Sequence, residues 1–185
     1  MPIDPTSELR QAAAPGVLWV AIVFAGVLGV NRSLLQEREN GCIQGLLLGP
    51  IDHGTIYLAK AVANFCFMAT ANAVVVPIFI FFFNLPFWLT LIRLAPVLLL
   101  GLLGFAAVGT LFAAVALRTR AREVMLPLLI LPLASPLIIA CVQASAVLLN
   151  DGHWSAVTHW LHLLAAFDVA FLVVGWLAFE YAVAE

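Results

Sequence analysis

The hydrophobic residues of this chain gather into five long runs, and most polar residues lie in the gaps between them. The runs cover residues 15–30, 56–83, 95–117, 124–149 and 160–183. About 20 apolar residues in a helix cross the hydrocarbon core of a bilayer, and the first run is the shortest of the five. The pattern predicts an all-α integral membrane protein, a polytopic helical bundle forming a single domain over residues 1–185.

The composition supports this prediction and excludes a water-soluble fold. Of the 185 residues, 64% are hydrophobic and 10% are charged, with a mean hydropathy of +1.11, whereas soluble domains carry about 25% charged residues. The net charge of −2 comes from few residues and leaves no basic patch for nucleic acid. The N-terminal sequence MPIDPTSELRQ lacks the basic region and short apolar stretch of a signal peptide.

The basic residues predict how the bundle is oriented. The gap between the first and second runs is flanked by Arg32, Arg38 and Lys60. The gap between the third and fourth runs contains Arg118, Arg120 and Arg122. Arg10 and Arg93 fall on the other side. Since cells retain basic residues on the cytoplasmic side of short loops, residues 31–55, 118–123 and the C-terminus are expected in the cytoplasm. The tryptophans then expected near the outer interface are Trp19, Trp88, Trp154 and Trp160.

The first cytoplasmic gap has an amphipathic pattern. Its apolar residues recur at a spacing of three to four, at Leu34, Leu35, Cys42, Ile43, Leu46 and Leu47. Its other side is polar, with Gln36, Glu37, Glu39, Asn40 and Gln44. This periodicity predicts a short helix at the membrane surface, with Asn40 able to cap a turn and Gly49-Pro50 as a stop. Such a helix can be an interfacial anchor without any protein partner.

The fourth run contains three prolines, Pro127, Pro132 and Pro136. Each removes a backbone donor and collides with the preceding turn, so this span is expected to be kinked or locally unwound. Because neighbouring helices or a cavity must satisfy the freed carbonyls, the span is expected inside the bundle. The kink can serve packing alone, or it can belong to an element that lines a path or moves.

Several polar and small residues lie inside the predicted spans. Asp168 is the costliest of them to bury and the best functional candidate, followed by Gln143, Asn64 and Asn72. An interhelical hydrogen bond or a snorkelling position explains Asp168 as well as a role in transport does. The small residues Gly101, Gly104, Gly109 and Ala113 of the third run predict close helix packing.

The candidates for metal binding and catalysis are weak. His153, His159 and His162 cluster near the outer end of the last run, and the last two would share a helical face. A third ligand at a suitable spacing is missing, so interfacial histidines are favoured and no metal site is predicted. Cys42, Cys66 and Cys141 have no C-x-x-C spacing and are expected to be small core residues. No hydrolase, metalloprotease or P-loop motif occurs, so the chain is not expected to be an enzyme.

Three stretches carry a resemblance to a known family. The order E-R-E-x-G, a leucine-rich turn, G-P-I-D and a downstream A-K resembles the coupling segment of type-2 ABC exporter permeases, which docks onto an ATPase subunit. With APGVLWVA, LAKAVANF and LPLLILPLASPLIIA, the chain is most similar to the heme exporter protein B (CcmB) family. The tail from Asn150 onward matches in hydropathy alone.

The resemblance implies a complex. It implies the permease of an ABC transporter for heme export, or for release of a heme-loaded chaperone, in cytochrome c-type biogenesis at the bacterial cytoplasmic (inner) membrane. The expected partners are a second copy of the permease, two copies of a cytoplasmic ATPase subunit, a heme-handling membrane protein and a periplasmic heme chaperone. No cofactor is expected on this chain; the partner subunit would bind ATP, and heme would be cargo. Family members have six spans, so the resemblance implies that the five predicted here lack the first one.

Within the coupling segment, residues 31–55, the resemblance assigns the ATPase contact to Glu37, Arg38, Glu39, Gly41 and Gly45. Three other functions stay open. The chain could be a type-2 permease that exports a drug, lipid or glycan. It could be a membrane scaffold whose polar segment lies on the lipid, or an intramembrane enzyme, although no credible nucleophile and base are paired.

Overall fold

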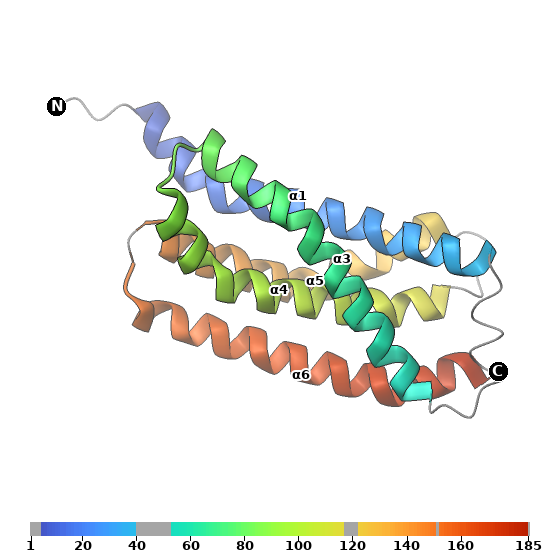
Figure 1. The fold of residues 1–185 in the computed structure, drawn as a ribbon. Coiled ribbons are helices and arrows are strands. Elements are labelled where there is room, and N and C mark those ends of the chain that lie inside the picture. The colour runs from blue at the N-terminus through green and yellow to red at the C-terminus, as the bar shows by residue number, and fades with distance from the viewer. Residues whose placement is uncertain (1–4, 40–52, 117–121, 151, 185) are drawn as a thin grey trace.

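The computed structural model describes residues 5–39, 53–116, 122–150 and 152–184, and these residues form five long helices (Figure 1). The helices are α1 (Pro5–Glu39), α3 (His53–Phe82), α4 (Phe87–Ala116), α5 (Arg122–Leu149) and α6 (Trp154–Ala184). Each contains an apolar stretch long enough to cross a membrane. The predictions of an all-α membrane protein and of five spans are therefore confirmed for the described part of the chain.

The turn between α3 and α4 shows how local sequence sets the helix ends. Asn84 has a φ of 54°, a left-handed conformation that asparagine tolerates better than most residues. The Leu85 N–H donates to the Ile80 carbonyl at 3.0 Å and the Asn84 N–H to the Phe81 carbonyl at 3.1 Å. These two bonds form a Schellman motif that closes α3. Pro86 follows immediately and precedes the first residue of α4, where its missing N–H costs no helical bond.

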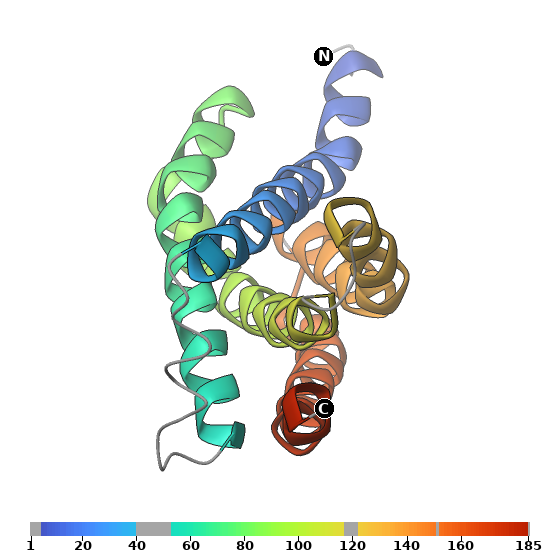
Figure 2. The ribbon, with the colours of Figure 1, turned by 90° about the vertical axis from the view of Figure 1, so that its right-hand side faces the viewer.

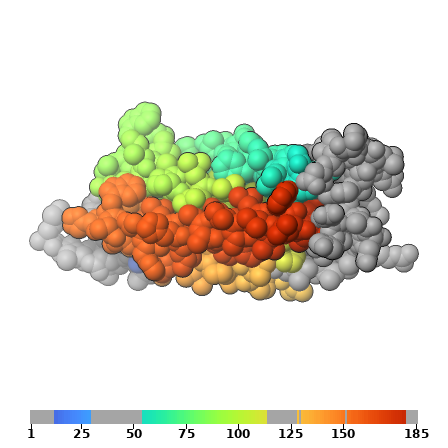
Figure 3. All heavy atoms as spheres, turned by 90° about the horizontal axis from the view of Figure 1, so that it is seen from below, coloured from blue at the N-terminus to red at the C-terminus, as the bar shows by residue number. Residues whose placement is uncertain are grey.

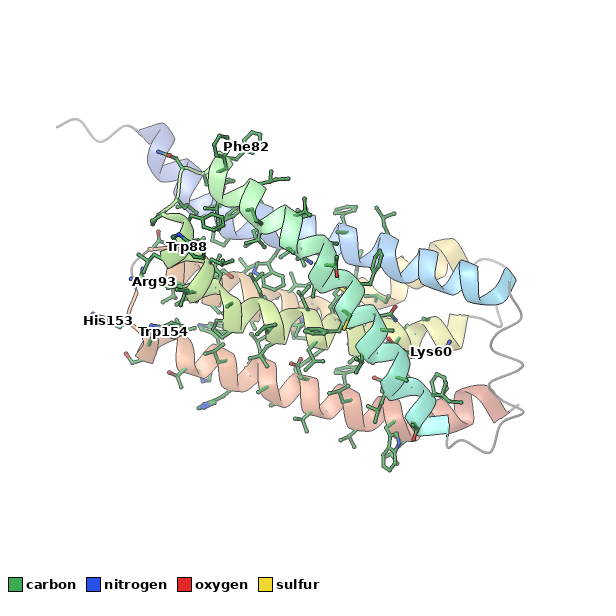
Figure 4. The ribbon with its side chains drawn as sticks, viewed as in Figure 1. Lys60, Phe82, Trp88, Arg93, His153 and Trp154 are labelled. Atoms are coloured by element: carbon green, nitrogen blue, oxygen red, sulfur yellow. The ribbon has the colours of Figure 1, made fainter. Side chains whose placement is uncertain are left out.

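Successive helices run in opposite directions through the bundle. At one end of the bundle, three helices end, α1, α4 and α6, and two begin, α3 and α5 (Figure 1). We call this end the coupling end. Lys60 lies toward the coupling end, whereas Trp88, Arg93, His153 and Trp154 lie at the opposite end (Figure 4). This arrangement places the two predicted cytoplasmic gaps and the C-terminus on the same side of the bundle.

α4 is the central helix. Viewed along the bundle, it is surrounded by α1, α3, α5 and α6 (Figure 2). In its apolar stretch 56% of the residues are buried inside the protein, against 17% for α6. A helix that is apolar all round can be buried on every side. α6 lies across one face of the molecule, with α3 on one side of it and α5 on the other (Figure 3).

Two sequence predictions need correction. Residues 34–39 continue α1 to Glu39 and do not begin a separate surface helix; the rest of the predicted amphipathic helix lies outside the described residues. Trp19 is not at the lipid interface: its ring is 2% exposed and packs in the core. Hydropathy could not predict the position of Trp19, because an indole ring suits both a membrane interface and a packed contact between helices.

Candidate functional site

Of the coupling segment, residues 31–55, the structure describes the two ends, residues 31–39 and 53–55. The backbones of Glu37, Arg38 and Glu39 form the last turn of α1, and Gly41 and Gly45 lie outside the described residues. The segment joins the coupling-end termini of α1 and α3 (Figure 1). A force applied to it would therefore reach α1 and α3 through the covalent chain.

The first turns of α3 are fixed to α4 and α6 through Tyr57. This side chain is fully buried, and its hydroxyl lies 3.1 Å from the carbonyl oxygen of Ala107 on α4 and 3.3 Å from that of Phe171 on α6. The hydroxyl can donate its single hydrogen to either carbonyl. The ring packs against Phe179 at a centroid distance of 5.8 Å and lies against Gly175, where a β-carbon would overlap it.

A second polar contact joins α3 to α4 about two turns further along. Asn64 Nδ2 donates to Thr110 Oγ1 at 2.9 Å, and the Thr110 hydroxyl donates to the Ala106 carbonyl of its own helix at 2.7 Å. Together with Tyr57, this contact ties the coupling-end half of α3 to the central helix by hydrogen bonds. Such interhelical bonds between membrane helices contribute about 0.6–2 kcal/mol each.

α1 is fixed to α5 through Trp19. Its indole Nε1 donates to Ser145 Oγ at 2.9 Å, and its ring lies against Gly101 of α4. Cys141 of α5 also lies against Gly101. A residue larger than glycine at position 101 would collide with both, so the small residue allows α1, α4 and α5 to meet.

Asp168 lies at the contact of α6 with α4 and α5. It is 2% exposed, and neither carboxyl oxygen has a hydrogen-bond partner among the described residues. Its Oδ1 lies against Gly104, which also contacts Leu137 of α5. A buried carboxyl group without a partner is costly in a membrane, which is the usual mark of a functional residue there.

The prolines of α5 do not lie where the sequence predicts. Pro132 and Pro136 are exposed on the outer face of α5, and Pro127 has no described side chain. α5 is helical at every residue from Arg122 to Leu149, so it is not locally unwound. Pro136 cannot donate to the Pro132 carbonyl, but Ser135 Oγ donates to that oxygen at 2.7 Å. On the side of Pro132 and Pro136 no described helix covers the span, and α5 satisfies the Pro132 carbonyl itself. The enclosed position of the span and its kink stay predictions.

The remaining candidates are at the surface. Gln143 is exposed on α5. His153, His159 and His162 are also exposed, and His159 makes an edge contact with Trp160 at 5.8 Å between ring centroids. No group of three or more potential metal ligands occurs among the described residues. Cys141 is buried as predicted but Cys66 is exposed, and Cys42 lies outside the described residues.

The sequence predictions missed Tyr57, Thr110, Trp19 and Ser145 as contact residues. One signal was available for Tyr57, since a tyrosine inside an apolar span must find an acceptor for its hydroxyl when buried. For the other three, the sequence does not show which helix faces which. Their pairing depends on packing between segments as far apart as Trp19 and Ser145.

Comparison with known proteins gives consistent matches. A family model described as CcmB protein matches residues 1–185. The chain is 32% identical over 159 residues to heme exporter protein B of Pseudomonas aeruginosa, covering 82% of this chain and 69% of that protein. It is 28% identical over 141 residues to heme exporter protein B of Rhodobacter capsulatus, covering 74% of this chain and 62% of that protein. It is 25% identical over 174 residues to heme exporter protein B of Bradyrhizobium diazoefficiens, covering 94% of this chain and 77% of that protein.

Proposed function

This chain belongs to the CcmB family, and we propose that it is the permease subunit of an ABC transporter complex for heme export in cytochrome c-type biogenesis. The observation that carries the proposal is the match of the family model over residues 1–185. Five helices able to cross a membrane agree with a multi-pass permease. No observation favours a drug, lipid or glycan as the substrate.

The ATPase resides on another subunit in this proposal. The sequence contains no G-x-x-x-x-G-K-[ST] motif to hold nucleotide phosphates. The charged residues Glu37, Arg38 and Glu39 end α1 at the coupling end, where they would contact a cytoplasmic ATPase. Gly41 and Gly45 would allow the close approach of backbones. The chain would itself be neither an enzyme nor the holder of a cofactor.

The structure offers a route by which the ATPase could act on the bundle. A displacement of residues 40–52 would pull on the start of α3, which Tyr57 holds to α4 and α6. It would also move the end of α1, a helix whose middle Trp19 holds to α5. Closure of the ATPase dimer could therefore change the packing of all five described helices. A second arrangement of these contacts is required for such coupling.

The proposed complex lies in the bacterial cytoplasmic membrane. It contains two copies of this chain, two copies of the ATPase, a heme-handling membrane protein and a periplasmic heme chaperone. The end opposite the coupling end carries Trp88, His153 and Trp154 (Figure 4), and it would face the periplasmic partners. Heme is the cargo of the complex or of its chaperone.

Charge reversal at the coupling end tests the ATPase contact. In the double variant Glu37→Lys/Glu39→Lys we expect co-purification of the ATPase subunit to fall at least tenfold, because two docking charges change sign. His153→Lys is the control, since His153 is exposed at the opposite end. Unchanged ATPase recovery with the double variant would contradict the docking proposal and favour a segment that lies on lipid alone.

A further inference from the structure

The outer face of α5 exposes a polar amide within a membrane span. Gln143 is exposed and makes no hydrogen bond with any described residue. It lies six residues before Leu149, the last residue of α5, which is about 9 Å along a helix that rises 1.5 Å per residue. In hydrocarbon, an amide without a hydrogen-bond partner is costly. A group outside the described residues is therefore needed to satisfy Gln143.

Gln143 shares one exposed face of α5 with proline, serine and isoleucine side chains. Pro132, Ser135, Pro136, Ile139 and Gln143 are all exposed and recur at a spacing of three to four; we call them the Gln143 face. The Ser135 hydroxyl is short and already donates to the Pro132 carbonyl. Short and compact side chains let helix backbones approach within a membrane.

Other outward faces of the bundle differ from the Gln143 face. The outward residues in the middle of α6 are Val169, Ala170, Val173, Val174 and Leu177, and those of α1 include Val17, Val20, Phe24 and Leu28. All of these side chains are apolar, as expected of surfaces that contact lipid tails. The amide of Gln143 therefore distinguishes α5 from these faces of α1 and of the middle of α6; nearer its start, α6 exposes the polar side chain of His162.

We propose that the Gln143 face is the contact between two copies of this chain. Two copies inserted with the same orientation place identical residues at the same depth, and a two-fold axis along the membrane normal brings Gln143 opposite its counterpart. A glutamine amide is both donor and acceptor. Nε2 of one copy can donate to Oε1 of the other, and the reverse bond forms by symmetry. This inference rests on the proposed function, which requires a pair of permeases.

Cysteine cross-linking tests the face directly. In full-length chains with Cys42→Ser, Cys66→Ser and Cys141→Ala, a single cysteine is introduced as Ile139→Cys or as Pro136→Cys, both of which keep Gln143. Oxidation in native membranes by copper phenanthroline is expected to give a product of twice the 19.9 kDa chain mass in both variants. The matched control is Val173→Cys, on the outward face of α6, which is expected to stay monomeric.

A second pair of variants tests the role of the amide. Adding Gln143→Leu to the Ile139→Cys chain is expected to lower the cross-linked fraction roughly fivefold or more, because the amide pair is lost. Gln143→Asn keeps a donor and an acceptor and is expected to retain more of the product. Equal cross-linking with Gln143→Leu would contradict the amide pairing.

The number of copies separates failure of this inference from failure of the proposed function. Single-molecule photobleaching of labelled chains in membranes counts the copies without reference to any face. Two copies per complex without cross-linking through Ile139→Cys or Pro136→Cys would overturn the Gln143 face and leave the permease pair intact. One copy per complex would overturn both, whereas ATPase co-purification tests the proposed function independently of the face.

Discussion

Oδ1 of Asp168 on α6 lies directly against Gly104 on α4, in the space that a β-carbon at position 104 would need. The two helices approach closely here because glycine has no side chain. The contact encloses the one aspartate that the structure describes within a span, and no described residue bonds to its carboxyl oxygens. Asp168 and Gly104 therefore have to be considered as a pair.

Adding a methyl group at position 104 should loosen this contact. We expect Gly104→Ala to lower the free energy of unfolding by about 1–3 kcal/mol, because Asp168 or Leu137 must shift. Gly16→Ala is the matched control: nothing lies within 4 Å of the added carbon, and alanine favours a helix by roughly 0.5–1 kcal/mol. Thermal unfolding in detergent compares the two. A stable Gly104→Ala protein would show that the close approach is not required.

Replacing the Asp168 carboxyl group should separate structure from function. We expect Asp168→Asn to keep or slightly raise the unfolding temperature, since no hydrogen bond to a described residue is lost. We expect cytochrome c maturation to fall at least tenfold, because an ionisable group inside a membrane is retained for function. Thermal unfolding and heme staining of c-type cytochromes measure the two effects. Full maturation activity in Asp168→Asn cells would assign the residue a packing role.

The Tyr57 hydroxyl should contribute to the attachment of α3. We expect Tyr57→Phe to destabilise the protein by about 1 kcal/mol, because the contacts with the Ala107 and Phe171 carbonyls are lost while the ring stays. Thr158→Val is the control, since the exposed Thr158 hydroxyl donates within its own helix to the Trp154 carbonyl. That change should stay within about 0.5 kcal/mol. Equal effects of the two variants on thermal unfolding would argue against an interhelical role for Tyr57.

Ser135 and Pro136 should act as a coupled pair. Ser135→Ala is expected to cost about 1 kcal/mol, because the Pro132 carbonyl loses its donor. In a Pro136→Ala background the backbone N–H of residue 136 can bond to that carbonyl, so Ser135→Ala should then have little effect. A double-mutant cycle by thermal unfolding measures the coupling. Additive effects would mean that the serine does not compensate for the proline.

Much of the fold could be predicted from the sequence because hydropathy and charge act locally. Five apolar runs predicted the number of long helices that the structure describes, and the basic residues predicted which gaps share one end, as Figure 1 shows. Helix ends were less predictable. α4 begins at Phe87 instead of residue 95, because Asn84 and Pro86 close one helix and open the next.

The direction in which a side chain points could not be predicted from one sequence. Trp19 is buried although tryptophan also suits an interface, and Pro132 faces outward although proline suggested an enclosed span. Both depend on how α1 and α5 rotate against α4, which is a property of packing between distant segments. Periodicity predicts that a helix has faces, but a span that is apolar all round does not show which face meets its neighbours.

Removing the gene from its own host tests the central claim most directly. We expect heme staining of c-type cytochromes to be lost while their polypeptides are still made, and a plasmid copy of the gene to restore it. A plasmid carrying Glu37→Lys/Glu39→Lys should not restore it. Normal heme attachment to c-type cytochromes in the deletion strain would contradict the proposal that this CcmB family chain is the permease for heme export in cytochrome c-type biogenesis.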